Sequence, residues 1–458
     1  MSSTSNSKKR AIVSICSNNY FPYVRILFDS VQKHHPEADL FLCLADKICS
    51  DVELGIRGVE IIPAASLGIE NFPDFAFRYD IMEFNTAVKP FVMRQLLESR
   101  GFTEVVYLDP DIELFAPMSP VFDAFAAGAD FVLTPHLTAP AEFKEFPNDI
   151  GIMKAGIYNL GFIALNNSQD AIAFLQWWER KLRFQCINQQ EKGVFVDQKF
   201  VDLLPAFHDN VAILRDHTLN VAYWNLEQRQ LTQTETGWLV DGEPLRFFHF
   251  SGIDVKQPQR LSKHTERFNG DLDAPLQAIV NHYLEQLQKF GYGANINPDY
   301  SYGKFSNDIP IANLMRRCYR DLPEKFSGNP FDSFDKYLNQ PSSLVSSISP
   351  WKVTNLMRYL WEQRADLQAV FNLNHLEGRF NYALWFVKHA AENNVDDYFL
   401  QPIIDNVDSE SKKYKLLLWL TKLLGDSTWK FRNFLKQSLW LPRKLRKPLR
   451  LLFKSFSN

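Results

Sequence analysis

The chain has 458 residues, of which 46% are hydrophobic and 22% charged, and its formal net charge is −3. This composition is typical of a soluble globular protein, and the slightly negative balance argues against nucleic acid as a main partner. The length exceeds what one hydrophobic core usually holds, so two domains are expected. No apolar run approaches the ~18 residues that a membrane-spanning helix needs.

The first residues and the cysteines together predict a cytoplasmic protein. The opening MSSTSNSKKR contains no apolar signal segment and runs directly into an expected strand. The five cysteines are scattered, odd in number and without metal-ligand spacing. Cys16 and Cys43 fall within apolar strand patterns, so we expect them to be reduced core residues.

Strand-like and helix-like segments alternate from residue 11 to about residue 253. This alternation predicts βαβ units and a mostly parallel sheet with helices around it. A pair of polar strands at Gln230–Arg246, joined at Asp241-Gly242, is instead expected to form a hairpin. The expected strands are Ala11–Cys16, Leu40–Leu44, Val59–Ile62, Val105–Leu108, Phe131–Thr134 and Ile157–Leu165, and the expected helices are Tyr23–His34, Ala87–Ser99 and Ala171–Phe184.

Beyond about residue 270 the strand patterns end and helical periodicity takes over. Helices are expected at Pro275–Lys289, Ala312–Tyr319, Pro350–Gln363 and Asn381–Glu392. The predicted organisation is a disordered N-terminus (1–10), an α/β domain (11–270), a linker with a connecting helix (271–310), a helical domain (311–426) and a basic amphipathic tail (427–458).

The tail from residue 427 to residue 458 carries nine Lys or Arg residues, no acid, and interleaved Trp, Phe and Leu. That composition is typical of a segment that lies on an anionic membrane surface. A final helix that packs on its own domain with a basic outer face has the same composition. The sequence leaves both interpretations open.

Two carboxylates follow the apolar strand Val105–Leu108, in Asp109-Pro110-Asp111. Open α/β sheets bind their ligands at the carboxyl ends of their strands. Two acids one residue apart, with a proline that stiffens the turn between them, suit a hard divalent cation carried on a diphosphate. A solvated turn after a strand is the alternative, so the surrounding motifs decide between the two.

Five other segments accompany this acid pair in a fixed order along the chain: Ile12–Tyr20 and Asn85–Phe91 before it, then Gly156–Ile163, Val196–Asp202 and His249–Gly252. In this order they resemble the metal-dependent nucleotide-sugar glycosyltransferases with the GT-A fold. The resemblance covers residues 11 to about 253 and is strongest to the retaining branch of glycogenin-like and lipopolysaccharide glycosyltransferases. It implies a Rossmann-like, mixed and mostly parallel sheet flanked by helices, followed here by a C-terminal α-helical domain.

The resemblance also implies a metal and nucleotide site. Asp111 is expected to ligate Mn²⁺ or Mg²⁺, Asp109 to contact the metal, the ribose or both, and His249 to complete the metal shell. An imidazole beside two carboxylates suits Mn²⁺ better than Mg²⁺. The residues expected to hold the nucleotide and its diphosphate are Ser14, Asn18, Tyr20, Lys89 and Gly252.

The donor sugar is expected to lie against Asn159 and Gly161, because an amide offers both donor and acceptor and a glycine permits close approach. Asp197 and Gln198 are expected beneath the anomeric carbon, and these two with Lys89 are the candidate catalytic residues. Lys256 lies farther from His249 than the family's His-x-Gly-x-x-Lys spacing allows.

The predicted function is transfer of a hexose from a nucleoside-diphosphate sugar, expected to be a UDP-sugar. The acceptor is expected to be a glycan, a glycolipid or a protein-linked glycan in bacterial surface-polysaccharide synthesis. A metal ligand at His249 favours retention of anomeric configuration. Inversion would need a carboxylate base, for which Asp149 and Asp197 are candidates.

Two other functions fit parts of the sequence. One is a non-catalytic sugar-nucleotide-binding or assembly protein that is held at the membrane by its basic tail. The other is a haloacid-dehalogenase-type phosphatase, whose first Asp is the nucleophile. Such sites follow the second Asp with x-Thr or x-Val, whereas Ile112-Glu113 follows here, which disfavours the phosphatase.

Overall fold

A computed structural model describes residues 9–405, apart from 50–54, 143–144, 269, 271, 294–298, 323–325, 343–352 and 402 and the side chains of 376 and 391. The chain forms two compact units, Met1–Ser333 and Phe334–Asn458. The expected basic tail, 427–458, lies outside the described residues, as do the first eight residues of the expected disordered N-terminus. The domain boundaries drawn from the sequence stay predictions.

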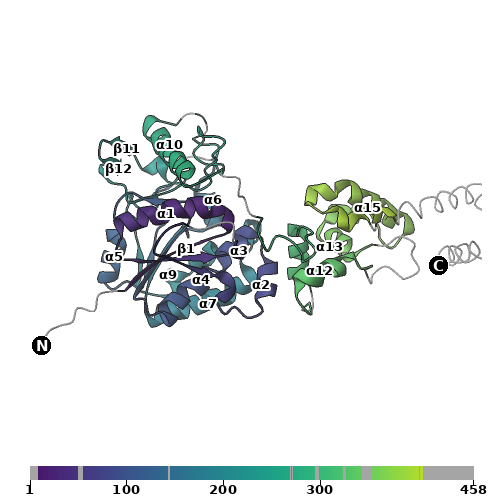
Figure 1. Ribbon diagram of the computed structural model, residues 1–458. Helices are drawn as coiled ribbons and strands as arrows, with labels where there is room; N and C mark the ends of the chain where they lie inside the picture. Colours follow the sequence, from purple (N-terminus) through teal and green to yellow (C-terminus); the bar gives the residue numbers. More distant parts are fainter. Residues whose placement is uncertain are drawn as a thin grey trace, which may run out of the picture. The chain divides into compact units, whose positions relative to one another are not determined.

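A sheet forms the centre of the first unit (Figure 1). It has seven strands in the order β10-β6-β7-β4-β1-β2-β3. Neighbouring strands are parallel except at β7, which is antiparallel to both β4 and β6. The predicted α/β class with a mixed, mostly parallel sheet is confirmed. The strands are β1 (Arg10–Cys16), β2 (Asp39–Leu44), β3 (Val59–Pro63), β4 (Glu104–Leu108), β6 (Phe131–Leu133), β7 (Phe162–Asn166) and β10 (Val211–Ile213).

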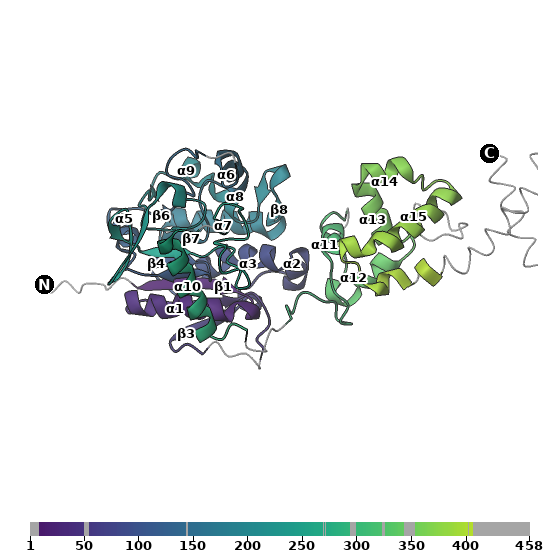
Figure 2. The same cartoon turned by 90° about the horizontal axis from the view of Figure 1, so that it is seen from above.

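Helices cover both faces of this sheet, so its strands are apolar on both sides (Figure 2). In β1, Ile12 packs toward α1 (Phe21–His34) and α5 (Ser119–Ala126). Its neighbours Ala11 and Val13 face α4 (Lys89–Arg94) and α7 (Gln169–Gln185). The buried residues of α1 recur at helical spacing, which explains why that segment is a helix lying on the sheet.

The helix expected at Ala87–Ser99 is wrong in its start. Two helices, α3 (Ile81–Ala87) and α4, follow one another here, and α4 continues into the π-helical turn η3 (Gln95–Ser99). Asp80 caps α3 by accepting from the Glu83 N–H at 2.9 Å, and Glu83 reciprocates in a capping box. The Thr86 hydroxyl lies inside α3 and donates to the backbone carbonyl of Met82 at 3.1 Å.

The strand expected from Ile157 begins only at Phe162. Before Phe162 the Asn159 N–H donates to backbone next to a strand, to the Thr134 carbonyl at 3.1 Å just after β6, whereas other N–H groups of the segment donate to side chains. Ile157 donates to Asp202 at 2.7 Å, and Leu160 donates to Gln198 at 2.9 Å. The segment is therefore a loop that approaches these two side chains closely.

The expected hairpin is a three-stranded meander. Its strands are β11 (Leu231–Thr234), β12 (Gly237–Val240) and β13 (Glu243–Pro244), all antiparallel. The predicted turn at Asp241-Gly242 joins β12 to β13, while Glu235-Thr236 joins β11 to β12.

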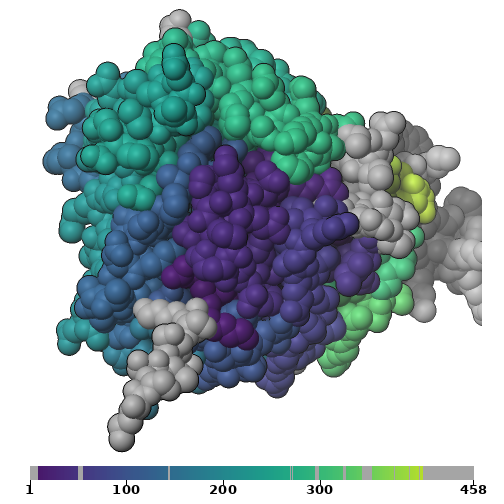
Figure 3. Space-filling model, turned by 60° about the vertical axis from the view of Figure 1, so that its left-hand side comes forward, coloured from purple at the N-terminus to yellow at the C-terminus, as the bar shows by residue number. Residues whose placement is uncertain are grey.

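Helix α10 (Ala274–Lys289) packs on the meander and beside α1, as Figures 1 and 3 show. Arg25 of α1 donates to the Phe290 carbonyl at 2.7 Å, just past the end of α10. This contact fixes the meander and α10 against the face of the sheet that α1 covers.

The remaining elements are short in the first unit and helical in the second. The first unit adds β5 (Ile112–Leu114), β8 (Asn188–Gln189), β9 (Val194–Phe195), β14 (Phe247–His249), α2 (Phe72–Arg78), α6 (Asp149–Ala155), α8 (Gln198–Val201), α9 (Leu204–Phe207) and α11 (Asn313–Arg320). Helix α12 (Pro330–Asn339) contains the division, and α13 (Asn355–Gln363), α14 (Ala365–Val370) and α15 (Leu376–His389) follow it. Within the described part of the chain, no helix has the length and apolar character needed to cross a bilayer.

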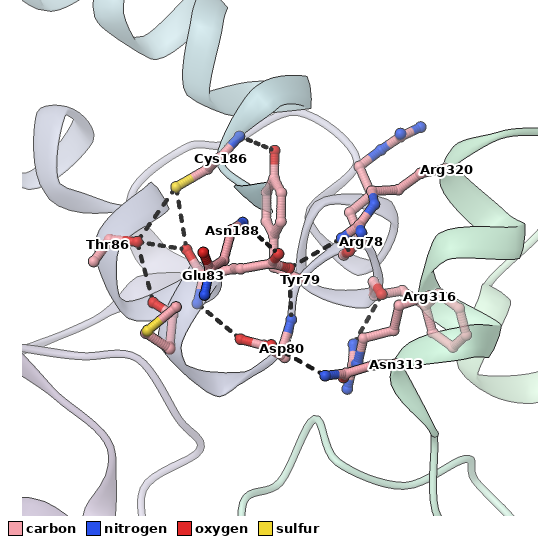
Figure 4. A network of polar contacts seen from close by, with 12 residues as sticks. Arg78, Tyr79, Asp80, Glu83, Thr86, Cys186, Asn188, Asn313, Arg316 and Arg320 are labelled. Carbon is pink, nitrogen blue, oxygen red and sulfur yellow. Dashed lines mark hydrogen bonds and ion pairs between the residues drawn. The ribbon is translucent and has the colours of Figure 1, made fainter. Parts of the chain in front are cut away.

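Helix α11 is joined to α2 and α3 by a buried polar network (Figure 4). The Arg316 guanidinium, 3% exposed, donates to the carbonyls of Phe77 at 2.8 Å and Tyr302 at 2.6 Å. Arg320 forms an ion pair of 3.0 Å with Glu83, which also accepts from the Asn188 N–H at 3.0 Å. The network therefore connects α11 with the start of the β8–β9 hairpin.

Candidate active site

The acid pair lies at the carboxyl end of β4, as its sequence position predicts. The Asp109 N–H donates to the Gly161 carbonyl at 2.8 Å, so β7 fixes the backbone where β4 ends. The Tyr107 hydroxyl donates to Asp109 Oδ1 at 2.5 Å. The side chains of Asp109 and Asp111 are 29% and 19% exposed, so both remain accessible to a ligand.

A second, two-stranded sheet brings His249 to the acids. Strand β14 pairs antiparallel with β5, which places His249 opposite Ile112, and the Phe250 N–H donates to the Asp111 carbonyl at 2.9 Å. His249 Nε2 lies 3.1 Å from Asp111 Oδ1 and 3.7 Å from Asp109 Oδ2. The ligand atoms of the three residues lie within 4.8 Å of one another, which makes them a candidate metal site.

Each group of this cluster influences the ionisation of the others. Burial lowers the pKa of His249, but the charge and the hydrogen bond of Asp111, together with the charge of Asp109, outweigh burial and raise that pKa above its ordinary value. Burial also opposes ionisation of Asp111, yet the adjacent imidazole lowers the pKa of this carboxyl. For Asp109, burial is the larger effect and raises the pKa.

The donor set fits a divalent cation. Two carboxylates and one imidazole suit Mn²⁺, and one cation among them would relieve the repulsion between the two acids. The His249 imidazole packs tightly against the backbone of Gly161. A Cβ on Gly161 would lie 2.4 Å from His249 Cε1 and 2.8 Å from Asn159 Oδ1. Gly161 therefore makes room for the His249 imidazole in this structure.

Lys89, a predicted catalytic and diphosphate-binding residue, is buried beneath the acids. Its ammonium lies 2.5 Å from Asp197 Oδ2 and donates to the Leu160 carbonyl at 2.7 Å. It also lies 4.1 Å from the centroid of the Tyr107 ring, whose hydroxyl binds Asp109. Lys89 thus connects Asp197 with the acid pair.

Asp197 has an unusual backbone neighbour. Val196 adopts φ +39°, a left-handed conformation that is costly for a β-branched residue. The Asp197 carbonyl accepts from Trp178 Nε1 at 3.2 Å, and burial raises the pKa of its carboxyl against the opposing charge of Lys89. Strained residues of this kind cluster where a side chain must be held in one position.

The oxygen and the nitrogen of the Gln198 amide both form hydrogen bonds with the loop before β7. Oε1 accepts from the Leu160 N–H at 2.9 Å, and Nε2 donates to the Ala155 carbonyl at 3.0 Å. Gly156 has φ +130°, and a Cβ there would lie 3.0 Å from Gln198 Cγ. In this structure Gln198 therefore shapes the loop that carries Asn159.

Asn159 belongs to a buried amide and imidazole network. Its Oδ1 accepts from the Gly161 N–H and from Asn220 Nδ2, each at 3.1 Å, and its Nδ2 lies 3.1 Å from His136 Nε2. Burial lowers the pKa of His136 to about 4, so its neutral ring accepts from Asn159. His136 and Asn220 come from two other loops, and nothing local in the sequence marks His136.

Trp224 joins this network to the metal site. Its ring stands at 90° to that of His249 with the centroids 5.1 Å apart, and it contacts His136 at 5.2 Å. Trp224 is 4% exposed, and its Nε1–H has no acceptor among the described residues. Trp224 is therefore a neighbour of the site. The sequence suggests this role only because Trp224 lies shortly before His249 along the chain.

The residues expected to bind the base and ribose lie in and after β1. Ser14 is fully buried, and Asn18, 2% exposed, donates through Nδ2 to the Lys47 carbonyl at 2.8 Å. The oxygens Ser14 Oγ and Asn18 Oδ1 have no hydrogen-bond donor among the described residues. Tyr20 is 37% exposed and stacks on Tyr23. Burial, with Asp111 and Asp109 adding to it, raises the pKa of Tyr20 to about 12.

Gly252 lies at the start of a loop, three residues after His249, with φ +74°. A Cβ there would lie 2.4 Å from His264 Cδ2, so the glycine admits the His264 ring. Lys256 is exposed, and its backbone N–H donates to Asp254. His264 is thus a further residue beside the site that sequence reasoning missed.

Comparison with known proteins gives distant similarities. No family model matches the chain. Two uncharacterised proteins of Bacillus subtilis (strain 168) are similar to it. YfnF is 26% identical over 270 residues, which are 57% of this chain and 88% of YfnF. YfnD is 27% identical over 151 residues, which are 32% of this chain and 46% of YfnD.

Solved structures that are similar to the chain include glycosyltransferases. The galactosyltransferase LgtC, in complex with donor and acceptor sugar analogues, is 16% identical over 63% of this chain and 98% of its own, with a TM-score of 0.39. GlyE of Streptococcus pneumoniae TIGR4 is 14% identical over 65% of this chain and 67% of its own, with a TM-score of 0.36. A glycosyltransferase involved in the glycosylation of the major capsid of PBCV-1 is 11% identical over 60% of this chain and 98% of its own, with a TM-score of 0.32. Likenesses this distant assign no activity, so function is argued from the site.

Proposed function

We propose that the protein is a metal-dependent glycosyltransferase that moves a hexose from a nucleoside-diphosphate sugar to a saccharide-bearing acceptor. The observation that carries this proposal is the convergence of Asp109, Asp111 and His249 within 4.8 Å at the carboxyl end of β4. Two carboxylates and an imidazole at that edge of an α/β sheet form a cation site where such sheets bind nucleotides. The order of the motifs along the chain agrees with this function.

The three residues would hold Mn²⁺ or Mg²⁺, and His249 favours Mn²⁺. Such a cation, when bound, stabilises the negative charge that develops on the departing nucleoside diphosphate. The Tyr107 hydroxyl keeps Asp109 oriented through its bond to Oδ1. Ser14, Asn18 and Tyr20, at the end of the neighbouring strand, are proposed to hold the nucleotide, which we expect to be uridine.

Asp197 is proposed to lie beneath the anomeric carbon, held ionised by Lys89. Because Lys89 binds its carboxylate at 2.5 Å, Asp197 is better suited to stabilise a cationic transition state than to take a proton. Asp149, the other candidate base, is exposed and accepts from the Ala141 N–H at 3.2 Å. This arrangement supports retention of anomeric configuration, in which a phosphate oxygen of the leaving group takes the acceptor proton.

Asn159, Gly161 and Gln198 complete the proposed sugar pocket. Gln198 acts there by shaping the loop through its two backbone contacts. The acceptor is proposed to be a glycan or a lipid-linked glycan in surface-polysaccharide synthesis. It would be used at the cytoplasmic face of a membrane, to which the segment 427–458 would bind.

The test is turnover of a panel of UDP- and GDP-hexoses by the full chain with Mn²⁺. We expect slow release of one nucleoside diphosphate, which Asp111→Asn abolishes and the control Asp254→Asn, outside the metal cluster, leaves unchanged. Metal-dependent nucleotide binding without turnover of any donor would support the non-catalytic assembly protein. A protein that binds no nucleotide with Mn²⁺ would overturn the proposal.

A further inference from the structure

The loop that follows β14 folds back against its own beginning. Its first glycine, Gly252, accepts at its carbonyl from the Lys263 N–H at 2.8 Å. A Cβ on Gly252 would lie 2.6 Å from Ser262 Oγ and 2.4 Å from His264 Cδ2. The segment 262–264 therefore lies against the backbone that continues from the metal ligand His249.

Ring contacts extend from His249 to His264. Trp224 lies 5.1 Å from His249, Tyr223 lies 5.0 Å from Trp224, and His264 lies 6.1 Å from Tyr223, all between ring centroids. Burial and the neighbouring Lys263 lower the pKa of His264, whereas Asp111 raises it. Both Lys263 and Asp111 are thus close enough to influence the His264 ring.

The loop is held in this conformation by its own polar contacts. The Arg260 guanidinium donates to the carbonyls of Ser262 at 3.0 Å and Thr265 at 3.2 Å. The Thr265 hydroxyl donates to the Phe146 carbonyl at 2.8 Å, and Arg267 forms an ion pair of 3.0 Å with Glu227. The positions of Lys263 and His264 are therefore fixed before any ligand arrives.

The charges of the site leave a diphosphate without enough positive partners. Two carboxylates balance one divalent cation, and the Lys89 ammonium is already paired with Asp197 at 2.5 Å. A bound diphosphate therefore needs other cations or N–H donors. Among the described residues, neither the Lys263 ammonium nor the ring nitrogens of His264 have a hydrogen-bond partner within the protein, and both residues are exposed.

We propose that Lys263 and His264 bind the diphosphate of the nucleotide. From its place in the sequence alone, Lys256 would be the candidate for this role. Lys263 would contribute a full positive charge and His264 a ring N–H. The proposal rests on the proposed function, because it takes the ligand to be a nucleoside diphosphate. The proposal also identifies the residues of this chain that would discriminate a nucleoside diphosphate from a nucleoside.

The test measures binding of UDP, GDP, uridine and guanosine to the full chain with Mn²⁺ by titration calorimetry. Lys263→Ala and His264→Ala should each weaken binding of the preferred diphosphate by about tenfold, since hydrogen bonds to charged groups are the stronger kind. Binding of the matching nucleoside should not change. Lys256→Ala, the matched control on the same loop, should stay within twofold of the unaltered protein for both ligands.

The possible failures are distinct. Equal diphosphate binding by Lys263→Ala, His264→Ala and the unaltered protein would overturn this inference alone, as would a loss confined to Lys256→Ala. If the unaltered protein binds neither diphosphate, the proposed function fails together with the inference. Lys263→Arg and His264→Gln, which keep an N–H donor, should retain most of the affinity. Loss of binding in these two variants, with an unchanged melting temperature, would also count against the inference.

Discussion

The Lys89 ammonium lies 2.5 Å from the Asp197 carboxylate, and these side chains are 1% and 2% exposed. Charges so deeply buried are tolerated only as a pair, because each compensates the desolvation of the other. The pair joins the first turn of α4 to the residue before α8, two elements that also border the acid pair. Stability and, under the proposed function, catalysis would therefore depend on the same contact.

Breaking this ion pair should destabilise the protein. Lys89→Met leaves the Asp197 carboxylate buried without a counter-charge, so the free energy of unfolding should fall by about 3–5 kcal/mol. Urea unfolding followed by circular dichroism measures it. The double variant Lys89→Met with Asp197→Asn should regain much of the stability but none of the nucleotide-sugar turnover. A single variant as stable as the unaltered protein would contradict the pairing.

Removal of the metal ligands should abolish turnover and leave the fold intact. Asp109→Asn and Asp111→Asn should each lower nucleoside-diphosphate release by about a hundredfold or more, because charge stabilisation of the leaving group is lost. Chelation with EDTA should have the same effect, and added Mn²⁺ should restore activity only in the unaltered protein. Retained activity after exhaustive chelation would exclude a metal role for the cluster.

His249→Ala should change which metal the site prefers. Two carboxylates without an imidazole form an oxygen-only site, so the ratio of Mn²⁺ to Mg²⁺ affinity should fall. Electron paramagnetic resonance of bound Mn²⁺, with Mg²⁺ as competitor, measures that ratio. An unchanged ratio would place His249 outside the metal shell.

The metal-free protein should show a pH-dependent contribution from the same cluster. The pKa of His249 is raised, mainly by Asp111 against burial, so its stabilisation is complete below the ordinary histidine pKa and is lost as pH rises through the raised value. The pKa of Asp111 is lowered, so its contribution is present above the ordinary aspartate pKa and is lost as pH falls through the lowered value. Melting temperatures in EDTA should therefore be less pH-dependent near neutrality in His249→Asn.

Protonation of His249 also opposes metal binding. Because an imidazolium offers no lone pair, Mn²⁺ affinity should increase with pH and level off above the raised His249 pKa. Calorimetric titration with Mn²⁺ at several pH values measures this dependence. His249→Asn should bind more weakly, with less dependence on pH.

Gly161→Ala should displace the metal-binding histidine. The added methyl would lie 2.4 Å from His249 Cε1, too close for either group to stay in place. We expect loss of Mn²⁺ binding. Gly128→Ala is the control: its φ of +100° strains the backbone, but nothing lies within 4 Å of the new methyl. That variant should lose about 1–2 kcal/mol of stability and keep its Mn²⁺ affinity.

The sequence predicts the sheet and the acid pair well, because both depend on local patterns. The apolar run before Asp109 identifies β4, and strand order then places the pair at the ligand-binding edge. The capping box of Asp80 and Glu83 is also a local pattern, and it begins α3, the helix before the one that carries Lys89. The catalytic and binding roles given to individual residues stay predictions.

Other parts of the site have no local signal. Strands β5 and β14 have three residues each, too few for a visible alternation, yet their pairing brings His249 to Asp111. The burial of Lys89 depends on Asp197, which is distant in sequence. His264 is placed by the fold of its loop and not by any spacing from His249.

The network around Glu83 also decides how short a stable fragment of this protein can be. A fragment that stopped at residue 310 would contain every candidate site residue but would lack Arg316 and Arg320. Glu83 would then lose its cation, and burial already raises the pKa of this carboxyl. Glu83 fixes the start of α3, which leads to Lys89, and binds Asn188 at the start of the hairpin that leads to Asp197. Truncation there would loosen both partners of the Lys89–Asp197 ion pair, so expression trials should retain the chain through α11.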